Sequence, residues 1–148
     1  MVNLRPATND DIDFYLKVRN DPEVWPGFYT QRKPLALKEH YNWWYTRNYN
    51  WSKFIIELAS QPIGILNIGQ QDHWSPEIGY AILSEYWGQG YGAEAVKMAL
   101  NWLKLNGYEY CHTTVLKNNE RSLRLLKRLD FEIMGDARPG EVWLTKTL

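Results

Sequence analysis

The hydrophobic positions of the chain change their period several times, and each period predicts a different element. Residues 1–7 predict a short strand, and Thr8 with Asp11 three residues later is typical of a helix N-cap with an acid in the first turn. Apolar residues then recur at helical spacing as far as Asn20, after which Asp21-Pro22 stops the helix. The chain therefore opens with a strand and an amphipathic helix.

The next stretch is rich in proline and has no clear period as far as Pro34. Pro34 suits the first turn of a helix, and it predicts a second helix that carries several aromatic residues and ends at the polar residues 47–50. Two segments rich in β-branched residues follow at 54–59 and 63–68, joined by the turn Ser60-Gln61-Pro62. They predict an antiparallel pair of strands.

The second half of the chain alternates strands with helices. A strand at 77–83 runs into a glycine-rich turn and then into a helix with a continuous apolar face. We expect a further strand at 108–116, a helix at 118–129, and closing strands at 131–137 and 141–146. The predicted order is β-α-α-β-β-β-α-β-α-β-β, an α/β fold with a mixed sheet, helices on both faces and one βαβ crossover.

Length and charge narrow the class of protein. The 148 residues suit a single domain, which we expect to span 1–148. Seventeen basic and 17 acidic side chains give a formal net charge of zero, which argues against nucleic acid or an anionic membrane as partner. The one cysteine, Cys111, cannot form an internal disulfide, and no apolar stretch reaches the length of a membrane span. We therefore expect a cytoplasmic protein, and its assembly as a homodimer is left open.

Three glycines at alternate positions, Gly88, Gly90 and Gly92, occupy the turn before the third helix. Such a turn brings backbone N–H groups close to a ligand, at the positive end of the helix dipole. It predicts an anion site, and a tight turn that binds nothing is the alternative. The turn lacks the Lys and Ser/Thr of a nucleoside-triphosphatase loop, and its spacing differs from G-x-G-x-x-G.

The segment Trp87–Ala93 resembles the acetyl-CoA-binding motif Q/R-x-x-G-x-G/A of the GNAT superfamily of N-acetyltransferases, with Trp87 at the Q/R position. An aromatic-Trp-Gly-Lys-Gly pattern is common in the branch that resembles ribosomal-protein N-acetyltransferases. Residues 119–131 resemble the N-x-x-S-x-x-hydrophobic segment of the same family, which ends in Lys-Leu-Gly-Phe. Together the two motifs imply the GNAT fold and acetyl-CoA as co-substrate.

The resemblance also implies roles for particular residues. Amides from Gln89 to Ala93 would hold the pyrophosphate, and the Ile82 N–H would polarise the thioester carbonyl. Asn119 and Ser122 would contact the far side of the cofactor. The implied cofactor-binding residues are Ile82, Leu83, Trp87, Gly88, Gln89, Gly90, Tyr91, Gly92, Ala93, Asn119 and Ser122.

The family often carries a Tyr that protonates the departing thiolate, at the position that is Leu126 here. Tyr80 and Tyr86 are the alternatives for this acid, and spacing does not select between them. Asp130 replaces the family's Gly before Phe131, and Asp tolerates a left-handed helix end better than most residues.

Acetyl transfer to an amine needs a base to free the nitrogen lone pair. Glu77 is the first candidate, because it starts the 77–83 strand and shares a face with Gly79 and Ala81; the alternative is a strand-end carboxylate bonded to a loop amide. Glu57 is the second candidate and His112 the third, since a histidine pKa near 6.5 suits a base. Water relays could replace a direct base. The histidines and Cys111 lack metal-ligand spacing, so no metal is predicted.

The acceptor is predicted from the segment between the first two helices. Residues 19–43 resemble the corresponding stretch of amino-sugar nucleotide N-acetyltransferases, which implies Arg19, Arg32, His40 and Trp43 as acceptor contacts. The alternative is a helix-capping Arg and a core stripe of aromatic residues. Protein N-termini are the second acceptor, and polyamines and aminoglycosides follow. A different class is a catalytically inactive acetyl-CoA-binding sensor, which the missing Tyr favours.

Overall fold

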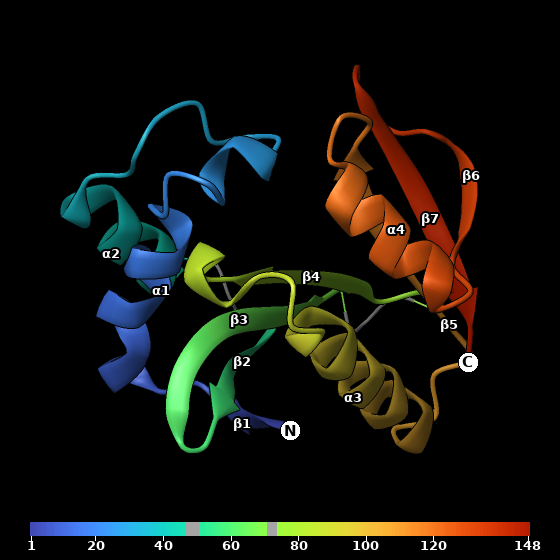
Figure 1. Cartoon of the computed structure of the whole chain (residues 1–148), viewed down its shortest axis with the longest axis horizontal. Coiled ribbons are helices and arrows are strands. Elements are labelled where there is room, and N and C mark those ends of the chain that lie inside the picture. The colour runs from blue at the N-terminus through green and yellow to red at the C-terminus, as the bar shows by residue number, and fades with distance from the viewer. Residues whose placement is uncertain (47–50, 71–73) are drawn as a thin grey trace.

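The structure is a computed structural model that describes residues 1–46, 51–70 and 74–148. A seven-stranded sheet in the order β1-β2-β3-β4-β5-β7-β6 runs through it (Figure 1). In chain order the elements are β1 (Val2–Pro6), α1 (Ile12–Arg19), α2 (Leu37–Thr46), β2 (Ser52–Leu58), β3 (Gln61–Gly69), β4 (Glu77–Ile82), α3 (Tyr91–Leu105), β5 (Tyr110–Leu116), α4 (Glu120–Arg128), β6 (Glu132–Asp136) and β7 (Glu141–Thr147). The predicted α/β fold with a mixed sheet is confirmed.

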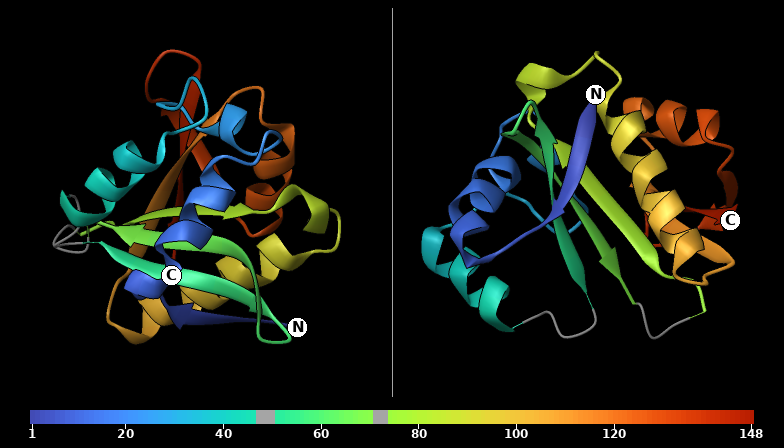
Figure 2. Two further views of the ribbon diagram at one scale, coloured as in Figure 1. Left: turned by 90° about the vertical axis from the view of Figure 1, so that its left-hand side faces the viewer. Right: turned by 90° about the horizontal axis from the view of Figure 1, so that it is seen from below.

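Helices cover both faces of the strands β2 to β4 (Figure 2). Ile55 and Ile65 are buried in the core that α1 and α2 complete. Their chain neighbours Ile56 and Leu66 are buried in the core that α3 and α4 complete. The alternating side chains of each strand therefore supply two cores. Within the described residues, no helix has both the length and the hydropathy that crossing a membrane would require.

The second helix begins at Leu37, so the predicted start at Pro34 is wrong. The side chain of Asn20 explains the difference, because it bonds both backbone groups of Leu35. Its Oδ1 accepts from the Leu35 N–H at 2.7 Å, and its Nδ2 donates to the Leu35 carbonyl at 2.9 Å. This pair of bonds holds the backbone outside the helix for the residues that follow Pro34.

The hairpin between β2 and β3 also differs from the prediction. Ala59 and Ser60 form a two-residue turn, both with positive φ (50° and 66°), and β3 begins at Gln61. Two positive φ values are typical of the turns whose twist matches that of paired strands. Pro62, predicted in the turn, therefore lies inside the strand.

Strands β4 and β5 are the parallel pair in an otherwise antiparallel sheet, and they are bridged at Glu77 and His112. Directly after this bridge the Thr113 hydroxyl donates to the Ile78 carbonyl at 2.7 Å. The Thr113 side chain thus bonds the Ile78 carbonyl, which would accept from a backbone N–H of β5 if the two strands stayed paired. Beyond this point β4 and β5 separate, and a gap lies between them in the middle of the sheet.

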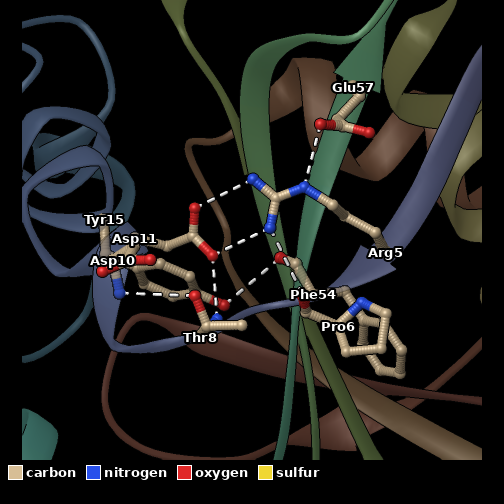
Figure 3. Close-up of polar contacts among 8 residues, drawn as sticks. All are labelled: Arg5, Pro6, Thr8, Asp10, Asp11, Tyr15, Phe54 and Glu57. Atoms are coloured by element: carbon tan, nitrogen blue, oxygen red, sulfur yellow. Dashed lines mark hydrogen bonds and ion pairs between the residues drawn. The ribbon is translucent and has the colours of Figure 1, made fainter.

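An ion-pair network fixes the start of α1 to the first two strands (Figure 3). The Arg5 guanidinium donates to both oxygens of Asp11, at 2.8 and 2.9 Å, and to Glu57 at 2.8 Å. Asp11 also accepts from the Thr8 N–H at 2.8 Å and completes the predicted capping box. The hydrogen bonds from Arg5 lower the pKa of the Asp11 carboxyl below its ordinary value. This network connects β1, β2 and α1.

We expect Arg5→Met to lower the free energy of unfolding at pH 7 by about 2 kcal/mol, because two largely buried carboxylates lose their cation. Asp11 binds its proton more weakly in the folded chain, so its contribution is present above its unfolded pKa and is lost as pH falls through the folded one. The difference between variant and wild type should therefore shrink in acid.

Urea unfolding at pH 7 and at pH 3 measures both values. Lys117→Met is the matched control, because the Lys117–Asp136 pair at 3.0 Å joins two exposed side chains and should contribute under 1 kcal/mol. An Arg5→Met variant as stable as this control at pH 7 would contradict the assignment.

Candidate active site

A cavity of about 710 Å³ lies in the gap between β4 and β5. The α1–α2 segment, β4, the glycine turn, β5 and α4 all contribute to its lining. The predicted site residues that line it are Arg19, Trp43, Glu77, Ile82, Trp87, Gly88, Gly90, Tyr91, Gly92, Ala93, Asn119 and Ser122. The predicted residues outside its lining are Arg32, His40, Glu57, Leu83, Gln89 and His112.

The glycine turn presents the N-terminus of α3 to the cavity. Gly88 and Gly90 have φ of +81° and +84°, where a side chain would be strained, and Gly90 is the N-cap of the helix. The first amides of α3 have no partner within the helix and point toward the turn. Gly92 serves another purpose, since a Cβ there would lie 3.1 Å from Leu125 of α4. Two glycines thus shape the turn and the third allows the helices to pack.

The backbone of β4 turns alternate amides toward the gap. The Leu83 N–H donates to the Ile63 carbonyl at 2.9 Å, so Leu83 belongs to a hydrogen-bonded pair with β3. In the same register, the N–H groups of Tyr80 and Ile82 point away from β3 and into the gap. The Ile82 carbonyl accepts from the Trp87 indole at 2.8 Å. Leu83, predicted to bind the cofactor, uses its amide inside the sheet instead.

Glu77 is the predicted base that lines the cavity. Its carboxyl is half-buried, and burial raises its pKa above the ordinary 4.5, although the positive charges of His112 and Arg138 oppose the shift. Gln70 donates to it at 3.4 Å, a long bond. A carboxylate with a raised pKa at the edge of a cavity is suited to accept a proton near neutral pH.

The other two predicted bases lie outside the cavity lining. Glu57 lies near the end of β2, where its carboxylate is paired with Arg5 and 16% of its side chain is exposed. His112 pairs with Glu77 in the sheet, and its Nδ1 lies 3.1 Å from the Ser75 hydroxyl. The alternation of polar and apolar residues along β2 does not show which face of the strand lies toward the cavity, so the sequence alone could not exclude Glu57.

On the acceptor side, the structure joins three of the four predicted contacts into one unit. The Arg19 guanidinium lies 4.3 Å from the centre of the Trp43 ring, and Nη1 donates to Nδ1 of His40 at 3.0 Å. His40 is fully buried and its Nε2 donates to the Ile12 carbonyl at 2.7 Å. Burial lowers the pKa of the imidazole and the neighbouring charge of Arg19 lowers it further, although the bond to the Ile12 carbonyl opposes the shift. His40 therefore orients Arg19 from outside the cavity lining, while Arg32 is exposed.

Helix α4 adds three arginines that the motif analysis missed. Arg121, Arg124 and Arg128 line the cavity, and the Arg121 guanidinium lies 3.3 Å from the centre of the Trp87 ring. Their spacing of three and four residues places them on one helix face. This spacing is visible in the sequence, and it was the signal that could have found them.

Two further polar contacts fix segments around the cavity. Arg138 donates to both oxygens of Glu141 at 2.9 Å and lies over the Tyr29 ring at 3.8 Å. Burial would raise the pKa of Glu141, but the bonds from Arg138 lower it overall. Asp21 accepts from the Ser84 N–H at 2.8 Å and so ties the α1–α2 segment to the turn after β4.

The two alternative acids are now distinguishable. The Tyr80 hydroxyl donates to Ser122 of α4 at 3.2 Å, across the gap, and burial raises its pKa. Tyr86 also lines the cavity, in the short turn after β4. Leu126 is 1% exposed and belongs to the core. Asp130 has a φ of 65°, which confirms the predicted left-handed helix end.

A parted parallel strand pair, with a helix N-terminus aimed into the gap, is the arrangement of an acyl-CoA-dependent N-acetyltransferase. The family model of the GNAT acetyltransferase domain matches residues 2–132. The chain therefore belongs to the GNAT family. Among the described residues, no group of three His, Cys, Asp or Glu side chains could hold a metal ion.

Several known proteins are similar to this chain. An uncharacterized protein from Methanocaldococcus jannaschii is 34% identical over 146 residues, which are 95% of this chain and 30% of that protein. The chain thus spans less than a third of that relative's length. A crystal structure of a domain from the same organism has a TM-score of 0.94 at 32% identity, and covers 100% of this chain and 99% of that one.

Two further structures share the fold at low identity. An aminoglycoside acetyltransferase in complex with coenzyme A has a TM-score of 0.84 at 17% identity, over 99% of this chain and 95% of that one. A spermidine N-acetyltransferase from Vibrio cholerae, in complex with coenzyme A and spermine, has a TM-score of 0.83 at 17% identity over the same shares.

Gly90→Ala should weaken the binding of coenzyme A at least tenfold, because an L-residue at φ +84° turns the first amides of α3 away from the cavity. Gly107→Ala is a matched control at the other end of α3, with φ +87° and open space around the added Cβ. Urea unfolding should show equal losses of stability in the two variants, and isothermal titration calorimetry with coenzyme A should show a loss of affinity in Gly90→Ala alone. Equal affinities would contradict an anion site at the turn.

Proposed function

We propose that this chain transfers an acetyl group from acetyl-CoA to the primary amine of an acceptor that enters from the α1–α2 side. The observation that carries the proposal is the cavity between β4 and β5, which brings the α3 N-terminus, the inward β4 amides and Glu77 together. These three groups offer an anion site, a carbonyl-polarising donor and a proton acceptor.

The residues present fit acetyl-CoA as donor. Gly88 and Gly90, with positive φ, expose the α3 amides to a pyrophosphate, and the arginines of α4 add positive charge beside them. The Tyr80 and Ile82 amides face the gap and can pair with an extended amide-bearing arm, as a missing β5 strand would. Asn119 and Ser122 line the same side.

The amide that polarises the thioester carbonyl must lie near the base. Each residue of a strand adds ~3.3 Å, so the Ile82 amide lies ~16 Å along β4 from Glu77 and the Tyr80 amide ~10 Å. We therefore assign the Tyr80 N–H to the carbonyl oxygen and the Ile82 N–H to the arm behind it. Glu77 removes the proton of the acceptor ammonium through an intervening water, because the Tyr80 amide that marks the thioester lies too far along β4 for a direct contact.

Glu77→Gln should lower kcat/KM about 100-fold, because the acceptor amine then has no base. In the wild type, kcat/KM should rise with pH as Glu77 loses its proton, and the raised pKa places this limb above the ordinary 4.5. The limb should vanish in Glu77→Gln and persist in Glu57→Gln, whose side chain is held by Arg5. A limb unchanged in Glu77→Gln would remove Glu77 as base.

We assign the protonation of the departing thiolate to Tyr80, because Leu126 occupies the position at which the family often carries its acid Tyr. As the new C–N bond forms and the C–S bond breaks, the nitrogen loses its second proton to solvent and the Tyr80 hydroxyl gives its proton to sulfur. The phenolate is then reprotonated from solvent. The Ser122 hydroxyl at 3.2 Å orients the phenol, and the nearby charge of Arg121 favours the transient phenolate.

Tyr80→Phe should reduce kcat at least tenfold and leave the Kd of acetyl-CoA within twofold of wild type, because the hydroxyl acts after binding. Tyr86→Phe is the control at the neighbouring phenol and should have a smaller effect on kcat. The reverse ranking of the two variants would transfer the role of acid to Tyr86.

An amino-sugar nucleotide is the acceptor that the aromatic and cationic lining of the α1–α2 segment supports first, and a protein N-terminus is the second. Polyamines and aminoglycosides are the acceptors named for the two low-identity neighbours. The inactive sensor is tested by a thiol-reactive dye and a panel of amines. Release of free coenzyme A with any amine supports the enzyme, and binding of acetyl-CoA without release supports the sensor.

A further inference from the structure

Arg19 is a cation of the cavity lining that has no role in the proposed acetyl transfer itself. It is half-buried at the end of α1 and lines the same cavity as Glu77. Burial lowers its pKa to about 10, and within residues 1–46, 51–70 and 74–148 no carboxylate lies within 4 Å of its guanidinium. A guanidinium in such a place is costly unless an anion compensates it.

The surroundings of Arg19 orient it without neutralising it. His40 accepts from Nη1 as a neutral imidazole, and the Trp43 ring supports the guanidinium plane. Within the part of the chain that the structure describes, the remaining guanidinium N–H groups have no hydrogen-bond partner. Arg19 thus brings an oriented and uncompensated positive charge to this side of the cavity.

The donor's phosphates do not need this charge. Three arginines of α4 line the cavity beside the glycine turn, and Figure 1 shows α1 and α2 at one end of the sheet and α4 at the other. Arg138, a further cation of the lining, is already paired with Glu141. Arg19 is left facing the space where the acceptor enters.

We infer that Arg19 binds an anionic group of the acceptor, so that the preferred acceptor is an amine carrying a phosphate or carboxylate group and not a polyamine. This inference rests on the proposed function and narrows its substrate class. A polyamine would bring positive charge against Arg19, whereas an oxyanion accepts directed N–H bonds from its guanidinium.

Matched acceptors test the inference through thiol release. Glucosamine is compared with glucosamine 6-phosphate and with its nucleoside diphosphate ester, propylamine with β-alanine, and spermidine is measured alongside. We expect at least one anionic amine to exceed its neutral partner at least tenfold in kcat/KM, and spermidine to be the poorest. The phosphate and carboxylate arms identify the oxyanion.

Arg19→Met should remove this preference by raising KM for the anionic acceptor, with the Kd of acetyl-CoA within twofold of wild type as evidence of folding. Arg19→Lys should restore part of it, since Lys keeps the charge without the planar fork. Lys33→Met, in an exposed position of the same segment, is the control and should keep the full preference.

The outcomes separate the two levels of the proposal. Failure to release thiol with every amine would overturn the proposed function itself. Thiol release that favours spermidine or the neutral amines, or an anionic preference that survives in Arg19→Met, would overturn the role of Arg19 and leave the acetyltransferase intact.

Discussion

The site depends on one hydrogen bond that interrupts a sheet. Thr113 donates its hydroxyl to the Ile78 carbonyl, directly after the bridge between β4 and β5. Because that carbonyl is satisfied, the two strands can part in the middle of a buried sheet without leaving an unpaired acceptor. The amides beyond this point are then free to pair with something other than protein. The site thus uses backbone amides of β4 that do not pair with β5.

The parted strands also separate two kinds of positive charge. On one side, helix amides and the arginines of α4 form a broad cationic surface suited to several phosphates. On the other side, one arginine is oriented by a buried neutral histidine and an indole ring. The first surface spreads its positive charge over several groups, whereas the second depends on the position of one side chain.

Much of the fold and of the donor site could be predicted from the sequence because the signals are local. Strand and helix periods gave the order of elements, and the glycines at 88 and 90 marked a turn whose positive φ values only glycine adopts without strain. What escaped prediction depends on distant contacts. The Asn20–Leu35 bonds that delay α2, the contact of Arg138 with Tyr29 and the partner of Glu57 each join residues whose proximity no period reveals.

The network around Arg5 has a consequence for the opposite end of α1. Asp11 is the N-cap of this helix, and Arg19 is its last residue, ~12 Å along the axis. Because the helix is one rigid element, the ion pairs that hold its first turn also help to fix where the Arg19 guanidinium lies in the cavity. The first dozen residues of the chain thus help to position a side chain of the cavity lining, although none of them lines the cavity itself.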